Sequence, residues 1–123
     1  MSISLQVFQQ AIGEKLCRFP QAFADEKVLQ ELIAEVLHDL KIPFDRECAL
    51  SSSDRPDFLI CNKTIAVEVK KGKAGMAELR QVGRYLSHDG IKAVLFIANR
   101  FTERVPELIG KPIYYLDLWK FQF

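Results

Sequence analysis

The sequence predicts one α/β domain in which helices cover both faces of a mixed β-sheet, a three-layer α/β/α sandwich. Residues 26–40 repeat apolar side chains at helical spacing. Residues 55–70 contain two β-rich runs that flank a short turn. Residues 91–98 form a near-continuous apolar run, which is typical of a strand buried on both faces. At 123 residues, the chain is long enough for a single hydrophobic core.

The N-terminal part is predicted to be helical. Residues 3–17 carry apolar side chains every three or four positions, and Pro20 ends this helix. The helix either caps the core or supplies a dimer surface. A second helix spans 26–40, with Asp25 as its N-cap. Its apolar stripe is Val28, Leu29, Leu32, Ile33, Val36, Leu37 and Leu40.

Residues 44–50 are expected to form the first strand, and a hairpin follows. If Asn62-Lys63 is a two-residue turn, Ile60 faces Ile65 and Asp57 faces Glu68. Alternation then places Lys70 on the same face as Glu68, while the apolar residues of the second strand point into the core. Two carboxylates and one ammonium group are therefore expected on one side of the sheet.

Opposed like charges destabilise a hairpin, so a stable fold has to offset the repulsion between Asp57 and Glu68. A shared proton or a bound cation would do so, and oxygen ligands on a short rigid scaffold suit Mg²⁺ or Mn²⁺. The alternative is that both are ordinary hairpin carboxylates, paired with Lys70 and Arg55.

The second half is predicted to alternate between helix and strand. Residues 71–75 are expected to form a flexible basic turn, and residues 76–87 a helix with Met76 facing inward. Parallel pairing of the hairpin with strand 91–98 would follow from this crossover. The remaining expectations are a loop at 99–102, a short helix over 105–109, a last strand over 112–117 and a docked aromatic tail over 118–123.

Pro56-Asp57, followed by Glu68-Val69-Lys70, resembles the motif of the PD-(D/E)XK nuclease superfamily. The chain looks most like its small Holliday-junction-resolvase-type and virus-type replication-repair nuclease domains. The resemblance covers residues 24–100 and implies a restriction-endonuclease-like core of helix, strand, hairpin, helix and strand. Residues 1–20 would be an added N-terminal helix, and residues 101–123 a C-terminal strand and aromatic tail.

The resemblance also implies roles for individual residues. Asp57, Glu68 and the backbone carbonyl of Val69 would hold Mg²⁺ or Mn²⁺, and Lys70 would contact the attacking water and the scissile phosphate. An auxiliary acid is expected on the preceding helix. Glu26 is the candidate because it lies about 60° from the centre of the apolar stripe, whereas Glu31 and Glu35 lie roughly 160° and 120° away. The alternative role of Glu26 is to complement the helix dipole.

In the family, a Gln and a Tyr four residues apart orient the substrate, and Gln81 and Tyr85 match that spacing. A spacing of four places them on one helix face, with Arg84 close by. The alternative is a half-buried core tyrosine and a solvated glutamine. Lys71 and Lys73 belong to a local excess of bases over residues 63–84, which could attract a phosphate backbone or be a solvated surface.

Composition limits the remaining possibilities. The formal net charge is only +1, so tight DNA binding by the chain alone is not expected. No apolar run approaches the roughly 20 residues of a membrane span, and no export signal is recognisable, so a cytoplasmic location with no membrane partner is expected. Cys17, Cys48 and Cys61 support neither a disulfide framework nor a zinc site.

The leading hypothesis is therefore a Mg²⁺-dependent deoxyribonuclease, either a structure-specific endonuclease or one targeted by a partner protein. A homodimer would let two sites cut paired strands. A second hypothesis is a non-catalytic nucleic-acid-binding or assembly module on the same fold. A third is an unrelated α/β domain with a chance match to the motif.

Overall fold

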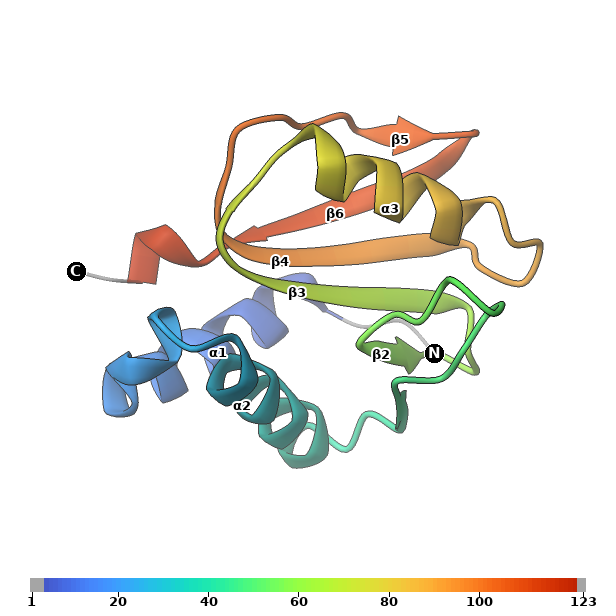
Figure 1. The fold of residues 1–123 in the computed structure, drawn as a ribbon. Coiled ribbons are helices and arrows are strands. Elements are labelled where there is room, and N and C mark those ends of the chain that lie inside the picture. The colour runs from blue at the N-terminus through green and yellow to red at the C-terminus, as the bar shows by residue number, and fades with distance from the viewer. Residues whose placement is uncertain (1–3, 122–123) are drawn as a thin grey trace.

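The computed structural model describes residues 4–121, whose strands form one mixed six-stranded sheet (Figure 1). The strand order is β1-β2-β3-β4-β6-β5. β3 pairs in parallel with β4, and β4 with β6, while the other neighbours are antiparallel. The strands are β1 Phe44–Arg46, β2 Phe58–Ile60, β3 Ile65–Ala74, β4 Ala93–Phe101, β5 Glu107–Leu108 and β6 Lys111–Asp117.

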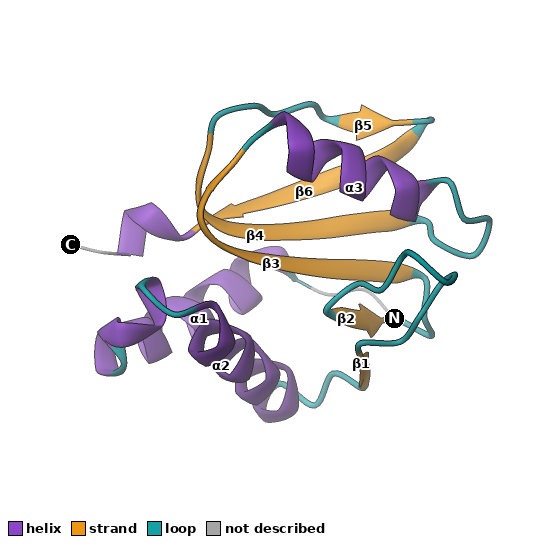
Figure 2. Cartoon of the chain, in the orientation of Figure 1, coloured by secondary structure: helices purple, strands orange, loops and turns teal. Residues whose placement is uncertain are grey.

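Helices α1 (Leu5–Arg18) and α2 (Glu26–Asp39) lie on one side of the sheet, joined by the short 3-10 helix η1 (Pro20–Phe23) (Figure 2). α2 begins as predicted, because Asp25 Oδ1 accepts hydrogen bonds from the amides of Lys27 and Val28 at 3.0 and 3.2 Å. The apolar stripes of both helices pack on the side chains of β2, β3 and β4 that point toward them.

Helix α3 (Met76–Leu86) lies on the opposite side of the sheet (Figure 1). Leu79, Val82, Tyr85 and Leu86 pack on the alternate side chains of the same strands and form a second apolar cluster. Glu78 Oε1 accepts a 2.7 Å hydrogen bond from the Gly75 amide, which stabilises the helix start. Met76, predicted to face inward, is instead 52% exposed, because it occupies the first position of the helix.

The hairpin register is as predicted. Ile60 pairs with Ile65 and Phe58 with Val67. The turn differs from the predicted two-residue type, because Cys61, Asn62 and Lys63 all have positive φ and the ladder ends at Ile60 and Ile65. The Thr64 amide donates to the carbonyls of both Ile60, at 3.1 Å, and Cys61, at 3.2 Å. The first strand is shorter than expected, since β1 ends at Arg46.

Residues 71–75 do not form the predicted flexible turn, because β3 continues to Ala74. Lys70 pairs with Ala98 and Lys73 with Arg100, so β3 carries one extra residue between these pairs. Gly72 has φ +80°, and the irregularity is a β-bulge. The lysine- and glycine-rich sequence resembles a turn, but pairing with β4 keeps it in the sheet.

Two other expectations for the C-terminal third are wrong. Residues 99–101 belong to β4, because they continue the pairing with the end of β3, and only Thr102 leaves the strand. The segment predicted as a helix over 105–109 contains β5, which pairs with the start of β6 through Glu107 and Pro112. The last strand is confirmed as β6, one residue longer at its start than predicted.

The aromatic tail begins as the 3-10 helix η2 (Leu118–Phe121). Leu118 is fully buried, and Trp119 is 44% exposed with the Arg100 guanidinium 5.3 Å from its ring centre. This part of the tail is therefore docked on the core, as expected. The rest of that prediction concerns residues 122–123, and the start of the first helix was placed at residue 3; these lie outside the described residues.

The bulge leads to a stability prediction. Gly72→Ala should lower the free energy of unfolding by about 1 kcal/mol, because a Cβ strains a residue at positive φ even though nothing lies within 4 Å of it. Gly90→Ala is the matched control, since its Cβ also meets nothing and its φ is not positive. Urea unfolding of both variants, analysed with the same m-value, measures the difference in the free energy of unfolding. Equal midpoints for the two variants would contradict it.

Candidate functional site

Asp57 lies immediately before β2, at the edge where α2 approaches the sheet. Its Oδ2 accepts a 2.7 Å hydrogen bond from the Val69 amide of β3. Its Oδ1 accepts a 3.1 Å hydrogen bond from Gln30 Nε2 on α2. The carboxylate is therefore held from two sides, by the neighbouring strand and by the helix layer beneath it.

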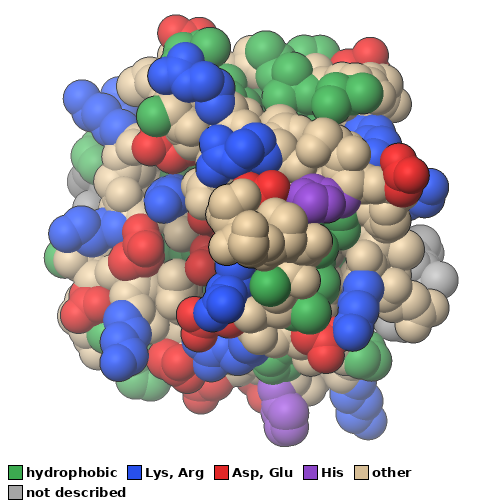
Figure 3. All heavy atoms as spheres, turned by 45° about the vertical axis from the view of Figure 1, so that its right-hand side comes forward, with side chains coloured by type: hydrophobic (Ala, Val, Ile, Leu, Met, Phe, Trp, Pro, Cys, Tyr) green, Lys and Arg blue, Asp and Glu red, His purple; other side chains and the backbone are tan. Residues whose placement is uncertain are grey.

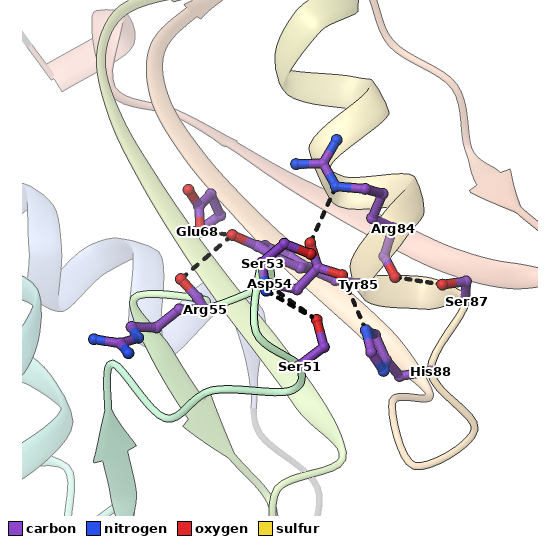
Figure 4. A network of polar contacts seen from close by, with 9 residues as sticks. All are labelled: Ser51, Ser53, Asp54, Arg55, Glu68, Arg84, Tyr85, Ser87 and His88. Atoms are coloured by element: carbon purple, nitrogen blue, oxygen red, sulfur yellow. Dashed lines mark hydrogen bonds and ion pairs between the residues drawn. The ribbon is translucent and has the colours of Figure 1, made fainter.

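Glu68 is buried on β3, with only 4% of its surface exposed. Its Oε1 accepts a 3.0 Å hydrogen bond from the hydroxyl of Tyr85, a fully buried residue of α3. The same hydroxyl lies 3.5 Å from the carbonyl of Arg55 (Figure 4). The ring of Tyr85 is therefore a buried core aromatic, which was the alternative to a substrate-binding role. Its hydroxyl nevertheless bonds to Glu68 in the candidate site.

The two carboxyl groups hold their protons unusually well. Burial raises the pKa of Asp57 to about 6, and the Val69 hydrogen bond only partly opposes this. Burial, followed by the negative charge of Asp57, raises the pKa of Glu68 to about 7. Burial and the neighbouring Glu68 also raise the pKa of Tyr85. The surroundings therefore favour the protonated form of both groups and do not neutralise the negative charge that the ionised pair would carry.

Glu26 is directed toward the sheet, as the helical angle predicted. Its Oε1 accepts a 3.0 Å hydrogen bond from the amide of Lys71, which has no ladder partner because it lies in the bulge. The charge of Glu26 also contributes to the raised pKa of Asp57. Glu31, the rejected candidate, instead pairs with Arg46 at 2.9 Å.

Lys70 is partly buried, and its positive charge acts on both carboxylates, lowering the pKa of each. Even so, within residues 4–121 no ion pair joins Asp57 or Glu68 to Lys70 or Arg55, which was the alternative explanation for the hairpin acids. Lys70 thus acts electrostatically on both carboxylates but forms an ion pair with neither of them.

Within residues 4–121, four other predicted residues make no side-chain hydrogen bond or ion pair with Asp57 or Glu68. Gln81 is partly exposed on α3 and makes no side-chain hydrogen bond within the described part of the chain. Arg84 Nε donates to Asp54 at 3.0 Å. Lys71 and Lys73 are exposed in the bulge and the last residues of β3. Their predicted contacts with a substrate remain predictions.

Sequence reasoning missed the residues that support the site. Gln30 could have been found, because it lies one turn after Glu26 on the same face of α2. Asp54 and His88 could not, because they are 34 positions apart and meet only in the folded chain, at 3.1 Å. This contact places His88, which follows the C-cap of α3, against the buried Asp54 carboxylate.

An open groove runs beside Asp57 between the start of α2 and the end of β1. Its walls contain three acids and two bases, so it is not a basic channel. On the face drawn in Figure 3, positive and negative side chains are likewise interspersed. The lining residues are Glu26, Lys27, Gln30, Glu31, Arg46 and Glu47.

The donors of the site suit a hard divalent cation, since they are carboxylate oxygens and Glu68 uses only Oε1 in its hydrogen bond with Tyr85. Each carboxylate has about four lone-pair positions, so the bonds to Asp57 leave room for a further ligand. Among residues 4–121, no set of three or more His, Cys, Asp and Glu side chains is arranged to hold a metal ion. The fit therefore rests on two carboxylates, with Glu26 nearby.

Comparisons of this chain with protein-family models, with curated proteins and with solved structures gave no match. In the described part of the chain, no helix is both long and apolar enough to cross a membrane.

The raised pKa values predict how stability depends on pH without divalent metal. The unfolded chain loses the Glu68 proton near its usual pKa of 4.5, while the folded chain keeps it to about 7. The free energy of unfolding should therefore fall by about 1–3 kcal/mol as the pH rises through this window. The titration of Asp57 lowers the free energy of unfolding in the same way between pH 3.8 and about pH 6.

Glu68→Gln removes one of these titrations and should flatten the curve, while the exposed Glu103→Gln should leave it unchanged. Denaturant unfolding in EDTA from about pH 5 to about pH 8 measures this. Parallel curves for wild type and Glu68→Gln would rule out a raised pKa at Glu68.

Proposed function

We propose that this protein is a Mg²⁺- or Mn²⁺-dependent deoxyribonuclease of the PD-(D/E)XK type. One observation carries the proposal: Asp57, just before β2, and Glu68, on the adjacent β3, lie close together and have no ion-pair partner within residues 4–121. Keeping both acids ionised is costly unless a cation joins them. The motif resemblance supplies the reaction class.

The arrangement of layers also supports the proposal. α2 lies on one side of β2, β3 and β4, and α3 lies on the other (Figure 1). This agrees with a three-layer α/β/α sandwich and a restriction-endonuclease-like core over residues 24–100. The hairpin and the parallel β3–α3–β4 crossover follow the order of elements that the resemblance implies.

In this proposal Asp57 and Glu68 hold the cation, with the Val69 carbonyl as a further ligand and Glu26 as an auxiliary acid. When bound, the cation supplies Lewis-acid activation of water and neutralises charge on the phosphate. The Val69 amide and Gln30 fix the orientation of Asp57, and the Tyr85 hydroxyl fixes Glu68. Lys70, free of an ion pair among the described residues, can stabilise charge on a phosphate.

The charge distribution favours limited contact with DNA. Positive and negative side chains alternate on the face in Figure 3, and the net charge is +1. A chain with few phosphate contacts binds weakly at physiological salt. Structure-specific cleavage, a homodimer or targeting by a partner protein would compensate, and a cytoplasmic setting is part of the same proposal.

Divalent metal should raise the melting temperature of the wild type at about pH 8, where the two acids are ionised, because a ligand of the folded state stabilises it by mass action. Glu68→Gln should lose most of this shift, and Glu103→Gln should retain it. Thermal unfolding with Mn²⁺, Mg²⁺ or EDTA measures the effect. A wild-type melting temperature that does not change when millimolar Mn²⁺ is added would count against a metal site.

Cleavage tests the activity itself. A panel of labelled plasmid, linear duplex, single strand, flap and four-way junction should be cut with Mg²⁺ or Mn²⁺ and not in EDTA. Glu68→Gln and Lys70→Met should each lower the rate by about 10²-fold or more, because each removes charge stabilisation at the phosphate. Lys92→Met is the matched control, since Lys92 lies before β4 with its amide bonded to Thr64, at the end of the sheet away from Lys70.

Metal-independent DNA binding with no cleavage of any panel member would exclude the nuclease and leave the non-catalytic binding module. Absence of both binding and cleavage would leave an unrelated α/β domain with a chance match to the motif.

A further inference from the structure

Asp54 is the second buried acid of the described chain, and the proposed chemistry does not use it. It is 6% exposed and lies in the loop that leads to Asp57. Its two carboxylate oxygens contact two residues from α3 and its C-terminal end (Figure 4). Oδ1 accepts from Arg84 Nε at 3.0 Å, and Oδ2 lies 3.1 Å from His88 Nε2.

The loop is shaped to direct Asp54 toward α3. Ser51 Oγ accepts hydrogen bonds from the amides of Ser53 and Asp54 at 3.3 and 3.2 Å. The Asp54 carbonyl accepts from the Leu50 amide at 2.7 Å, which closes the turn. The contact with His88, followed by that with Arg84, holds the pKa of Asp54 below its usual value against the effect of burial, so the carboxylate stays ionised.

Arg84 is held by only one edge of its guanidinium. Its side chain is 54% exposed, and only Nε takes part in the contact with Asp54. The two terminal nitrogens point away from Asp54 in Figure 4 and have no hydrogen-bond partner within residues 4–121. A guanidinium edge of this kind matches two oxygens of a phosphate. Arg80, also exposed, lies one turn earlier on α3.

Arg84 is also close to the candidate centre in the chain. The next residue, Tyr85, donates its hydroxyl hydrogen bond to Glu68. The loop that Asp54 ties to α3 continues through Arg55 to Asp57, so this contact connects the guanidinium to the segment that carries one of the two acids. A phosphate bound by Arg84 would therefore lie beside the carboxylates.

We propose that Asp54, supported by His88, orients Arg84 to bind a phosphate of the nucleic-acid backbone next to the cleavage site. This inference rests on the proposed function and adds to it a positioning residue and a phosphate subsite. Asp54 itself touches neither substrate nor metal. Its role is to hold Arg84 through Nε, so that the two terminal nitrogens face the substrate. Because the side chain is already ordered, it loses less conformational entropy on binding.

The direction in which Asp54→Asn changes DNA affinity distinguishes this orienting role from a general effect of charge. Asp54→Asn makes the surface more positive by one charge, and general electrostatics then predicts tighter binding of DNA. Loss of orientation predicts weaker binding instead. Asp117→Asn is the matched control, because Asp117 pairs with Arg104 at 3.3 Å away from α3 and its loss changes the charge equally.

The experiment is equilibrium binding of the preferred labelled DNA in EDTA at several salt concentrations. Arg84→Met should raise Kd about 3–10-fold and lower the salt slope by about 1, because one phosphate contact is lost. Asp54→Asn should raise Kd by a similar factor. The double variant should bind no worse than Arg84→Met, because Asp54 acts through Arg84.

Asp117→Asn should bind as well as the wild type or more tightly. Tighter or unchanged binding by folded Asp54→Asn, or fully additive effects in the double variant, would overturn the positioning role and leave the proposed nuclease intact. A wild type that binds no DNA would overturn both.

His88→Ala serves where Asp54→Asn does not fold, since it keeps the Arg84 contact and removes its support. About 2–5-fold weaker binding supports the proposal, on the scale of one lost hydrogen bond. Unchanged binding by folded His88→Ala in that case overturns it.

Discussion

The fold is arranged around one constraint, which is that the half-buried Asp57 and the buried Glu68 lie close together at an apolar sheet. Neither Asp57 nor Glu68 has an ion-pair partner among residues 4–121, so hydrogen bonds must offset their removal from water. The 2.7 Å bond from the Val69 amide and the 3.0 Å bond from Tyr85 do so. One helix layer contributes Gln30 and the other contributes Tyr85, so both faces of the sheet converge on the same site.

The hairpin register could be predicted because two β-rich runs flank a short turn segment, which places Ile60 opposite Ile65 and so brings Asp57 opposite Glu68. Burial alone could not have fixed this register, since β2 and the middle of β3 are buried on both faces of the sheet. The choice of Glu26 over Glu31 was equally accessible, because the apolar stripe of α2 fixes its rotation against the sheet.

Other features could not be predicted, because they depend on contacts between distant segments. The run from Lys71 to Gly75 has the composition of a turn, and only pairing with β4 reveals a bulge. β5 is two residues long and exists only because β6 lies beside it. The contact of Asp54 with His88 joins a polar loop to a helix end, and neither segment carries a local pattern that indicates the other.

Lys70 and Arg84, which would attract a phosphate, lie near Asp57 and Glu68, which would repel it. This mixture of charges favours the hypothesis of catalysis over that of DNA binding alone. A module that only binds DNA gains nothing from Glu68 and Asp57, whose charges oppose those of Lys70 and Arg84. In the proposed function, a bound cation would offset this repulsion and contribute to phosphate binding. It would also offset the burial and mutual charge that raise the pKa values of Asp57 and Glu68.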